Sequence, residues 1–189
     1  MTTLVFFLEE PSAKEMLQGI LPKLLPEQVS SRFIVFEGKQ DLEKQLVRKM
    51  RLWNKPDSRF IVMRDQDAGD CRKIKDNLLK KCHEAGKTDV VMRIACHELE
   101  SFYLGDLQAV EQGLELTNLA KLQKNKKYRE PDSIPKAAQE LLRLTKKYDK
   151  VSGSRAIGKH LHLDGNCSRS FNVLVKAIRD IVAESIKNN

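Results

Sequence analysis

The chain has 189 residues, of which 41% are hydrophobic and 32% are charged. This is the length of one domain, or of one domain with a helical extension, and the composition is too apolar for a disordered chain. No apolar run approaches the roughly 18 residues that a membrane span needs, and Glu9 and Glu10 end the first apolar run too early for a signal peptide. The four cysteines include no CxxC pair, which favours a reducing compartment. These features favour a cytoplasmic protein and exclude secreted, metal-stapled and membrane proteins.

The net charge of +8 is distributed unevenly along the chain. Residues 1–119 carry 18 Lys and Arg against 19 Asp and Glu, whereas residues 120–189 carry 16 against 7, a net charge of +9. A basic region beside a near-neutral one predicts a polyanionic partner, most often nucleic acid. A well-solvated helical surface explains the same composition equally well.

The first half of the chain alternates strand and helix patterns. Residues 4–8 form a continuous apolar run, which is typical of a strand buried on both faces of a parallel sheet. Ser12 is expected to cap a helix that carries an apolar stripe to residue 25 and is kinked or broken at Pro22. Further strands are expected over residues 32–36, 59–63 and 89–95, with helices over 41–53 and 71–84. The alternation predicts an α/β fold with a parallel sheet, strand order 2-1-3-4, and a switch point between strands 1 and 3.

After Cys96 the strand patterns stop. Short helical patterns cover residues 98–104, 107–113 and 118–124, and longer ones cover 136–148 and 170–186. Residues 124–135 are polar and hold two prolines, which predicts a loop. We therefore predict an α/β core over residues 1–115, followed by a basic helical C-terminal portion, residues 116–189, that packs on the core.

Carboxylates follow three of the predicted strands. Glu9 and Glu10 follow the first, Asp65 and Asp67 the third, and Glu98 and Glu100 the fourth. Neighbouring strands of a sheet lie about 4.8 Å apart, so Glu9 and Asp65 can share one cation if their strands are adjacent. Clustered carboxylates repel one another unless they are protonated or metal-bound, and hard oxygen ligands suit Mg²⁺ or Mn²⁺. The alternative for Asp65 and Asp67 is an ordinary loop or helix cap, but acids after three strands favour the metal site.

A second candidate site is the segment 148–155, which combines cations, hydroxyls and a glycine before a helical stretch. Lys150, Ser152 and Arg155 in this context suit phosphate contact at a helix N-terminus, although a capped turn fits equally well. The histidines lack the partners of a zinc site. The chain has no Walker A loop, GxSxG elbow or dinucleotide fingerprint, so we expect neither autonomous ATP hydrolysis nor serine hydrolase chemistry.

Five short motifs occur in a specific order that spans nearly the whole chain. They read EExSA at residues 9–13, RDQD at 64–67, ELExxxLxD at 98–106, YxKxSGxRxI at 148–157 and SRSF at 168–171. The set resembles small stand-alone proteins of the Toprim superfamily, some of which occur beside AAA or ABC-type ATPases in phage-defence settings. The superfamily's fold is also found in primases, topoisomerases and OLD-type nucleases.

The resemblance implies a Toprim-like, Rossmann-like parallel sheet and a role for each acid. Glu9 is the strand-1 acid, Asp65 and Asp67 are the Asp-x-Asp pair, and Glu100 is the later acid, with Glu98 as its rival. Two positions depart from the pattern. Glu10 stands where many Toprim proteins have glycine, and Gly69 stands where topoisomerases have a third acid, with Asp70 as a possible substitute. No nucleophilic tyrosine accompanies the pattern, so hydrolysis by metal-activated water fits better than covalent chemistry.

The sequence therefore predicts a Mg²⁺- or Mn²⁺-dependent Toprim-like nuclease that acts on nucleic acid, with an ATPase as a further partner. Catalytic roles are expected for the four acids that hold the metal and for one lysine: Glu9, Asp65, Asp67, Glu100 and Lys150. The substrate's phosphates are expected to contact Lys150, Ser152 and Arg155. The secondary candidates are Glu10, Asp70 and Glu98. Two alternatives stay open, a non-catalytic regulatory module for an ATPase and a metal-dependent phosphoryl-transfer enzyme that acts on nucleotides.

Overall fold

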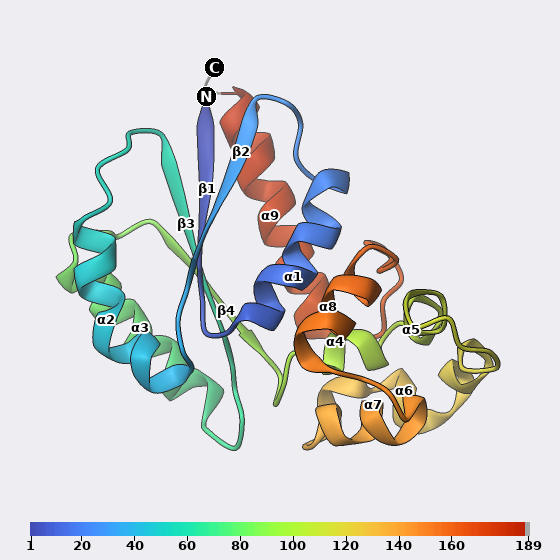
Figure 1. Ribbon diagram of the computed structural model, residues 1–189. Coiled ribbons are helices and arrows are strands. Elements are labelled where there is room, and N and C mark those ends of the chain that lie inside the picture. The colour runs from blue at the N-terminus through green and yellow to red at the C-terminus, as the bar shows by residue number, and fades with distance from the viewer. Residues whose placement is uncertain (188–189) are drawn as a thin grey trace.

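A computed structural model describes residues 1–187 and contains one four-stranded sheet in the order β2-β1-β3-β4, with every neighbouring pair parallel (Figure 1). The strands are β1 (Thr2–Leu8), β2 (Val29–Val35), β3 (Ser58–Asp65) and β4 (Val90–Ala95). The α/β class and the predicted strand order are both confirmed. Strand β2 begins earlier than its apolar run because polar residues also pair with β1, as in the 3.0 Å hydrogen bond between the hydroxyls of Thr3 and Ser30.

Helices cover both faces of the sheet (Figure 1). One face carries α2 (Lys39–Arg51) and α3 (Cys71–Glu84), and the other carries α1 (Pro11–Ile20) and α9 (Arg169–Lys187). Successive side chains of a strand point to opposite faces, so the apolar run of β1 serves two cores. Val5 and Phe7 pack with α2 and α3, whereas Leu4, Phe6 and Leu8 pack with α1 and α9. This double burial is the reason that β1 is apolar throughout.

The first helix differs from its prediction at one end. Its cap residue is Glu10 rather than Ser12, because Pro11 occupies the first helical position, where its preset φ and missing N–H suit a helix start. Ser12 lies inside the first turn, and its hydroxyl donates a 2.7 Å hydrogen bond to Glu10. At the other end Pro22 breaks the helix as predicted, since α1 stops at Ile20 and a short 3-10 helix, η1 (Leu21–Lys23), follows.

The chain after β4 is helical, as predicted. Its elements before α9 are α4 (Ser101–Leu104), α5 (Leu107–Gly113), η2 (Ala120–Lys124), α6 (Lys126–Arg129), η3 (Pro131–Ser133), α7 (Ala137–Thr145) and α8 (Lys150–Gly158). The predicted loop over 124–135 thus contains two short helical turns. A single apolar cluster runs from Leu4 to Val182 across both parts of the chain. The proposed division after residue 115 stays a prediction. Within residues 1–187 no helix combines the length and apolarity that crossing a membrane requires.

Glycines allow α8 to pack at backbone distance from two other helices. A Cβ added to Gly19 of α1 would lie 2.3 Å from the carbonyl carbon of Gly158, and one added to Gly113 of α5 would lie 2.7 Å from the Cα of Ile157. Side chains larger than hydrogen do not fit at these positions. The close packing fixes α8 against α1, so that Lys150 at the start of α8 lies beside Glu10 at the start of α1.

Candidate functional site

The carboxyl ends of β1 and β3 bring two acids together. Glu9 directly follows β1, Asp65 is the last residue of β3, and the two strands pair in register up to Leu8 and Met63. The backbone N–H of Asp65 donates a 3.0 Å hydrogen bond to Oε2 of Glu9, and Nε of the buried Arg64 lies 3.9 Å from the same oxygen. The expected adjacency of the two strand ends is confirmed.

Glu100 reaches the same region from the segment after β4. It is the cap residue of α4, and its side chain is fully buried. The hydroxyl of Tyr148 donates a 2.9 Å hydrogen bond to Oε1, whereas Oε2 is buried without a hydrogen-bond partner among the described residues. Leaving a buried acceptor unsatisfied costs about 1–3 kcal/mol, and more when the group is charged. The free oxygen therefore favours a proton or a cation beside it.

The pKa values of these three carboxyl groups are raised. Burial raises the pKa of Asp65 well above its usual value, and the charges of Glu100, Glu10 and Glu9 raise it further. Burial also raises the pKa of Glu9, against the hydrogen bond from Asp65 and the charge of Arg64. For Glu100 burial outweighs the opposing effects of Lys150 and Tyr148 on the pKa. The group of five residues Glu9, Glu10, Asp65, Glu100 and Lys150, called here the carboxylate cluster, thus holds negative charge that the protein alone does not stabilise.

Lys150 is the cationic member of the carboxylate cluster. Its Nζ lies 3.4 Å from both carboxylate oxygens of Glu10. Burial lowers the pKa of Lys150, but the charges of Glu100, Glu10 and Asp65 outweigh this effect and the pKa is raised. Lys150 therefore stays protonated at neutral pH, where its ammonium group can bind a phosphate.

Asp67 lies at the rim of the carboxylate cluster. Its carboxylate is 2.8 Å from Nζ of Lys39 and its side chain is 40% exposed, although its charge contributes to the raised pKa of Glu9. Its backbone is left-handed, with φ of 53°, and its N–H donates to the carbonyl of His97 at 2.7 Å. This loop geometry separates the environment of Asp67 from that of the partly buried Asp65.

The remaining predicted residues have other partners. Asp70 accepts hydrogen bonds from two backbone N–H groups and caps α3, and Glu98 accepts one from the N–H of Ala138 at the start of α7. Ser152 binds Asp149, the cap residue of α8. Arg155 forms a 2.6 Å ion pair with Glu15 of α1 and is largely exposed. The structure therefore brings these four residues into helix caps and a surface ion pair rather than into the carboxylate cluster.

Two residues of this region have roles that the sequence did not indicate. Arg64 holds Glu9 and also pairs with Glu43 of α2, and Tyr148 holds Glu100. Both lie inside the quoted motifs, Arg64 directly before Asp65 and Tyr148 two residues before Lys150. An arginine at the end of an otherwise apolar strand is a signal that could have indicated the first. The second has no local signal, because 48 residues separate Tyr148 from its partner.

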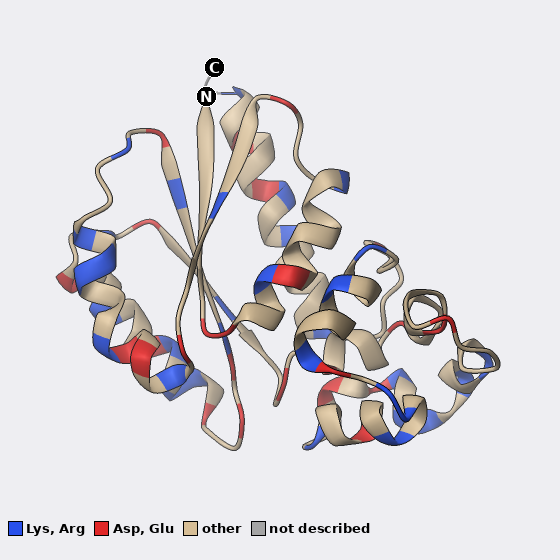
Figure 2. Ribbon diagram, in the orientation of Figure 1, with Lys and Arg blue, Asp and Glu red and all other residues tan. Residues whose placement is uncertain are grey.

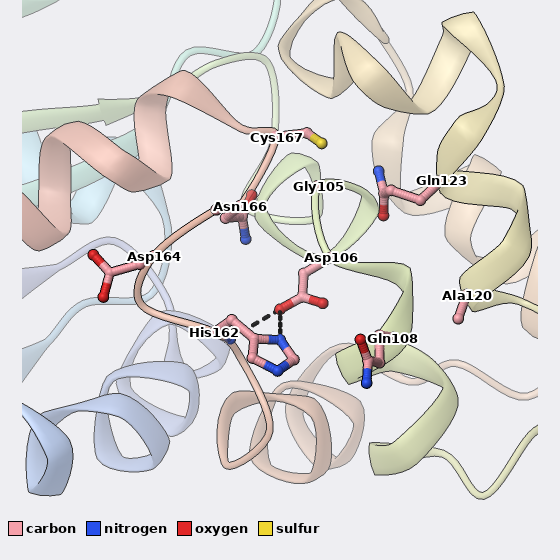
Figure 3. A pocket seen from close by; sticks show the side chains of 10 residues that line it. Gly105, Asp106, Gln108, Ala120, Gln123, His162, Asp164, Asn166 and Cys167 are labelled. Carbon is pink, nitrogen blue, oxygen red and sulfur yellow. Dashed lines mark hydrogen bonds and ion pairs between the residues drawn. The ribbon is translucent and has the colours of Figure 1, made fainter.

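A separate cavity of about 280 Å³ lies beside α5 (Figure 3). No residue of the carboxylate cluster lines it. Asp106 accepts hydrogen bonds from the N–H of Ala109 and from both the backbone and Nδ1 of His162, while Asn166 donates to the carbonyl of Phe102. These bonds tie the loop after α8 to the start of α5. The polar groups of this cavity thus serve the fold.

The carboxylate cluster fits a hard divalent cation by its chemistry. It offers carboxylate oxygens with raised pKa values and one buried oxygen without a partner, and Mg²⁺ prefers oxygen ligands. Within residues 1–187, however, no three His, Cys, Asp or Glu side chains lie close enough to hold an ion on their own. Proteins usually bind Mg²⁺ with one or two carboxylates plus substrate phosphates. The cluster therefore suits a cation that is bound jointly with a phosphodiester.

Stability without divalent cations is expected to fall as the pH rises above about 5. The native carboxyls of Glu9, Asp65 and Glu100 have raised pKa values, so the native state binds more protons than the unfolded state once the pH exceeds the ordinary values of 3.8 and 4.5. Glu140, whose pKa is lowered to about 2, acts in the opposite direction but only below this range.

Urea denaturation in EDTA between about pH 5 and 8 measures this effect as a decreasing free energy of unfolding. The decrease should be smaller in Glu100→Gln and smaller when Mg²⁺ is present. A free energy of unfolding that is constant or rises over this range would contradict the electrostatic account.

Two solved structures share this fold across almost the whole chain. The C-terminal region of the Xanthomonas campestris pv. campestris OLD protein has a TM-score of 0.50 and 14% sequence identity, covering 97% of this chain and 97% of that chain. The C-terminal region of the Burkholderia pseudomallei OLD protein has a TM-score of 0.52 and 16% identity, covering 95% and 98%. The fold is that of an OLD-type Toprim-like domain.

The chain belongs to the family described as a domain of unknown function, DUF4276, whose model matches residues 8–179. No curated protein matches the chain significantly. The matched range begins at the end of β1 and includes every residue of the carboxylate cluster. The resemblance to Toprim proteins in sequence and the likeness in fold thus concern the same part of the chain.

Proposed function

We propose that this protein is a Mg²⁺- or Mn²⁺-dependent nuclease that hydrolyses phosphodiester bonds of nucleic acid. The observation that carries the proposal is the buried Oε2 of Glu100, which lacks a partner in the described chain and lies in a cluster with two other carboxyls of raised pKa and a protonated lysine. Glu9, Asp65 and Glu100 are the candidate ligands, of which one or two would hold the metal together with phosphate oxygens of the substrate, and Asp67 would supply a further oxygen from the rim.

The chain's own residues have separate tasks in this proposal. A bound divalent cation would supply positive charge to the scissile phosphate and lower the pKa of a water. Tyr148 fixes the orientation of Glu100, while Arg64 and the N–H of Asp65 fix Glu9. Lys150 presents an ammonium group where negative charge develops on the phosphate, and such preorganised charge is a large contribution to catalysis.

Water is the favoured nucleophile. The hydroxyl of Tyr103 donates a hydrogen bond to Ser154, and the hydroxyl of Tyr148 donates one to Glu100. Burial raises the pKa of both phenols well above the usual value, so neither forms a phenolate at neutral pH. This supports hydrolysis over topoisomerase-like covalent chemistry.

The direct test incubates the purified protein with plasmid DNA and with single-stranded RNA in Mg²⁺, in Mn²⁺ and in EDTA. We expect cleavage of at least one substrate with either metal and none in EDTA. Absence of cleavage in all conditions, with and without a co-encoded ATPase, would refute the nuclease and leave the regulatory module.

Lys150→Ala is expected to lower cleavage about 10–100-fold, because one preorganised charge on the transition state is removed. Arg155→Ala is expected to have a smaller effect, since Arg155 is held by Glu15 on the surface. Lys126→Ala removes the same charge from the exposed helical region and is the control. Initial rates at saturating Mg²⁺ measure the three variants. Equal losses in all three would remove Lys150 from the site and indicate a general effect of charge.

A second candidate function is a regulatory or effector module for an AAA or ABC-type ATPase, as in an ATPase-associated phage-defence system. It is favoured because both similar structures are C-terminal regions of OLD proteins and this chain covers nearly all of each. An ATPase would then act in trans. Cleavage that requires the co-encoded ATPase would support an effector subunit, whereas binding to the ATPase without any cleavage would support a non-catalytic module.

A further inference from the structure

Helices α2 and α3 form a basic layer on one face of the sheet. Each helix carries five Lys or Arg residues against two Asp or Glu, and Figure 2 shows their blue segments repeating along both helices. On the opposite face α1 carries one basic and one acidic residue, and α9 carries four basic residues against two acidic ones. Residues 1–119 are near neutral in sum, but their positive charge is therefore concentrated on this layer.

Most cations of this layer are unpaired. Six exposed ones make no ion pair or side-chain hydrogen bond within residues 1–187: Lys44, Arg48, Arg72, Lys73, Lys75 and Lys80. On the opposite face two exposed arginines are paired, Arg155 with Glu15 and Arg179 with Asp164. Like charges four residues apart on a helix, such as Lys44 and Arg48, destabilise it. The layer therefore carries positive charge that the fold neither needs nor neutralises.

The layer begins at the edge of the sheet that holds the carboxylate cluster. Helix α2 starts at Lys39, whose Nζ lies 2.8 Å from Asp67, and α3 starts just after the loop that follows Asp65. The 13 residues of α2 span about 20 Å, which corresponds to about six base pairs of duplex. A polyanion bound along the layer would thus reach the rim of the cluster.

The composition of the layer favours nucleic acid over a protein partner. Protein interfaces are depleted in lysine and enriched in aromatic residues, whereas this surface is rich in lysine. None of the large exposed hydrophobic side chains of the described chain lies within α2 or α3. We infer that the α2–α3 layer is a sequence-independent docking surface for the phosphate backbone of nucleic acid. The inference rests on the proposed function for its substrate class, but docking is measured without cleavage.

The experiment measures fluorescence anisotropy of a labelled mixed-sequence DNA duplex of about 20 base pairs in EDTA, from about 50 to 200 mM salt. One variant combines Lys44→Gln, Arg48→Gln, Lys75→Gln and Lys80→Gln. The control combines Lys159→Gln, Lys176→Gln, Arg179→Gln and Lys187→Gln, which removes the same number of lysines and arginines from α9 and the end of α8. Melting curves verify that both variants are folded.

We expect the layer variant to bind about tenfold more weakly or worse, with the slope of log K against log salt reduced by about 0.9 for each phosphate that the variant no longer neutralises. The control should stay within about threefold of the wild type. Equal weakening of both variants, unchanged binding by the layer variant, or no binding by the wild type would each overturn the docking surface. Poly-L-glutamate serves as an acidic polypeptide for comparison. If the layer variant keeps its DNA binding but loses a binding to poly-L-glutamate that the wild type has, the docking surface is also overturned and an acidic protein partner is indicated.

Failure of the docking surface is distinguishable from failure of the nuclease. If the wild type binds DNA more tightly than the layer variant does, but neither Mg²⁺ nor Mn²⁺ supports cleavage, only the nuclease proposal is refuted. If the layer variant cleaves as fast as the wild type, only the docking surface is refuted.

Discussion

Asp65→Asn is expected to abolish metal-dependent cleavage and to raise the melting temperature of the metal-free protein. Burial and the charges of Glu100, Glu10 and Glu9 all raise the pKa of Asp65, so its ionised form is unfavourable in the native state at neutral pH. Asparagine has nearly the same shape and removes the charge. Cleavage should fall by about 10³-fold or more, since a metal ligand that acts on the transition state is lost.

Thermal melting in EDTA and initial cleavage rates in Mg²⁺ measure the two effects. Asp67→Asn is the control, because Asp67 is half-exposed and paired with Lys39, and an exposed pair contributes only about 0.2–1 kcal/mol. Its melting temperature should change little and its cleavage should fall less. An Asp65→Asn protein that melts no higher than the wild type, or that still cleaves, would place Asp65 outside the metal site.

The sheet could be predicted because its signals are local. A continuous apolar run such as residues 4–8 is compatible with a strand buried on both faces, and the alternation with amphipathic helices dictates parallel pairing. Once the order of the strands is known, the meeting of Glu9 and Asp65 follows from their positions at strand ends. The cap at Ser12 was wrong because Pro11 sets the helix start earlier, with Glu10 as the cap residue.

The rest of the site depends on contacts between distant segments. Tyr148 reaches Glu100 across 48 residues, and Lys150 reaches Glu10 across 140. Asp70 and Glu98 are acids in the same stretches as the site residues, yet they cap α3 and α7, and only the backbone geometry distinguishes these roles. A sum of charge along the chain also concealed the basic layer of α2 and α3, because acids elsewhere in residues 1–119 balance it.

Gly19→Ala is expected to destabilise the protein, although the same exchange in an unobstructed helix stabilises it by about 1 kcal/mol. The new Cβ would lie 2.3 Å from the carbonyl carbon of Gly158 and 2.6 Å from the nitrogen of Lys159. These are backbone atoms, so no side-chain rotation relieves the overlap and α8 must move away from α1. Overpacking of this kind costs about 1–3 kcal/mol, and occasionally more.

The helix preference of alanine offsets part of this cost, so a net loss of about 1–2 kcal/mol is expected, which corresponds to a drop of about 2–8 °C in the melting temperature of a chain of this size. Because α8 carries Lys150, its displacement also separates Lys150 from Glu10, and cleavage should fall further than the population of folded protein does. Gln18→Ala is the matched control, since Gln18 is exposed in the same helix and alanine there should be neutral or slightly stabilising. A Gly19→Ala protein as stable as the Gln18→Ala protein would mean that the backbone contact between α1 and α8 does not hold Lys150 in place.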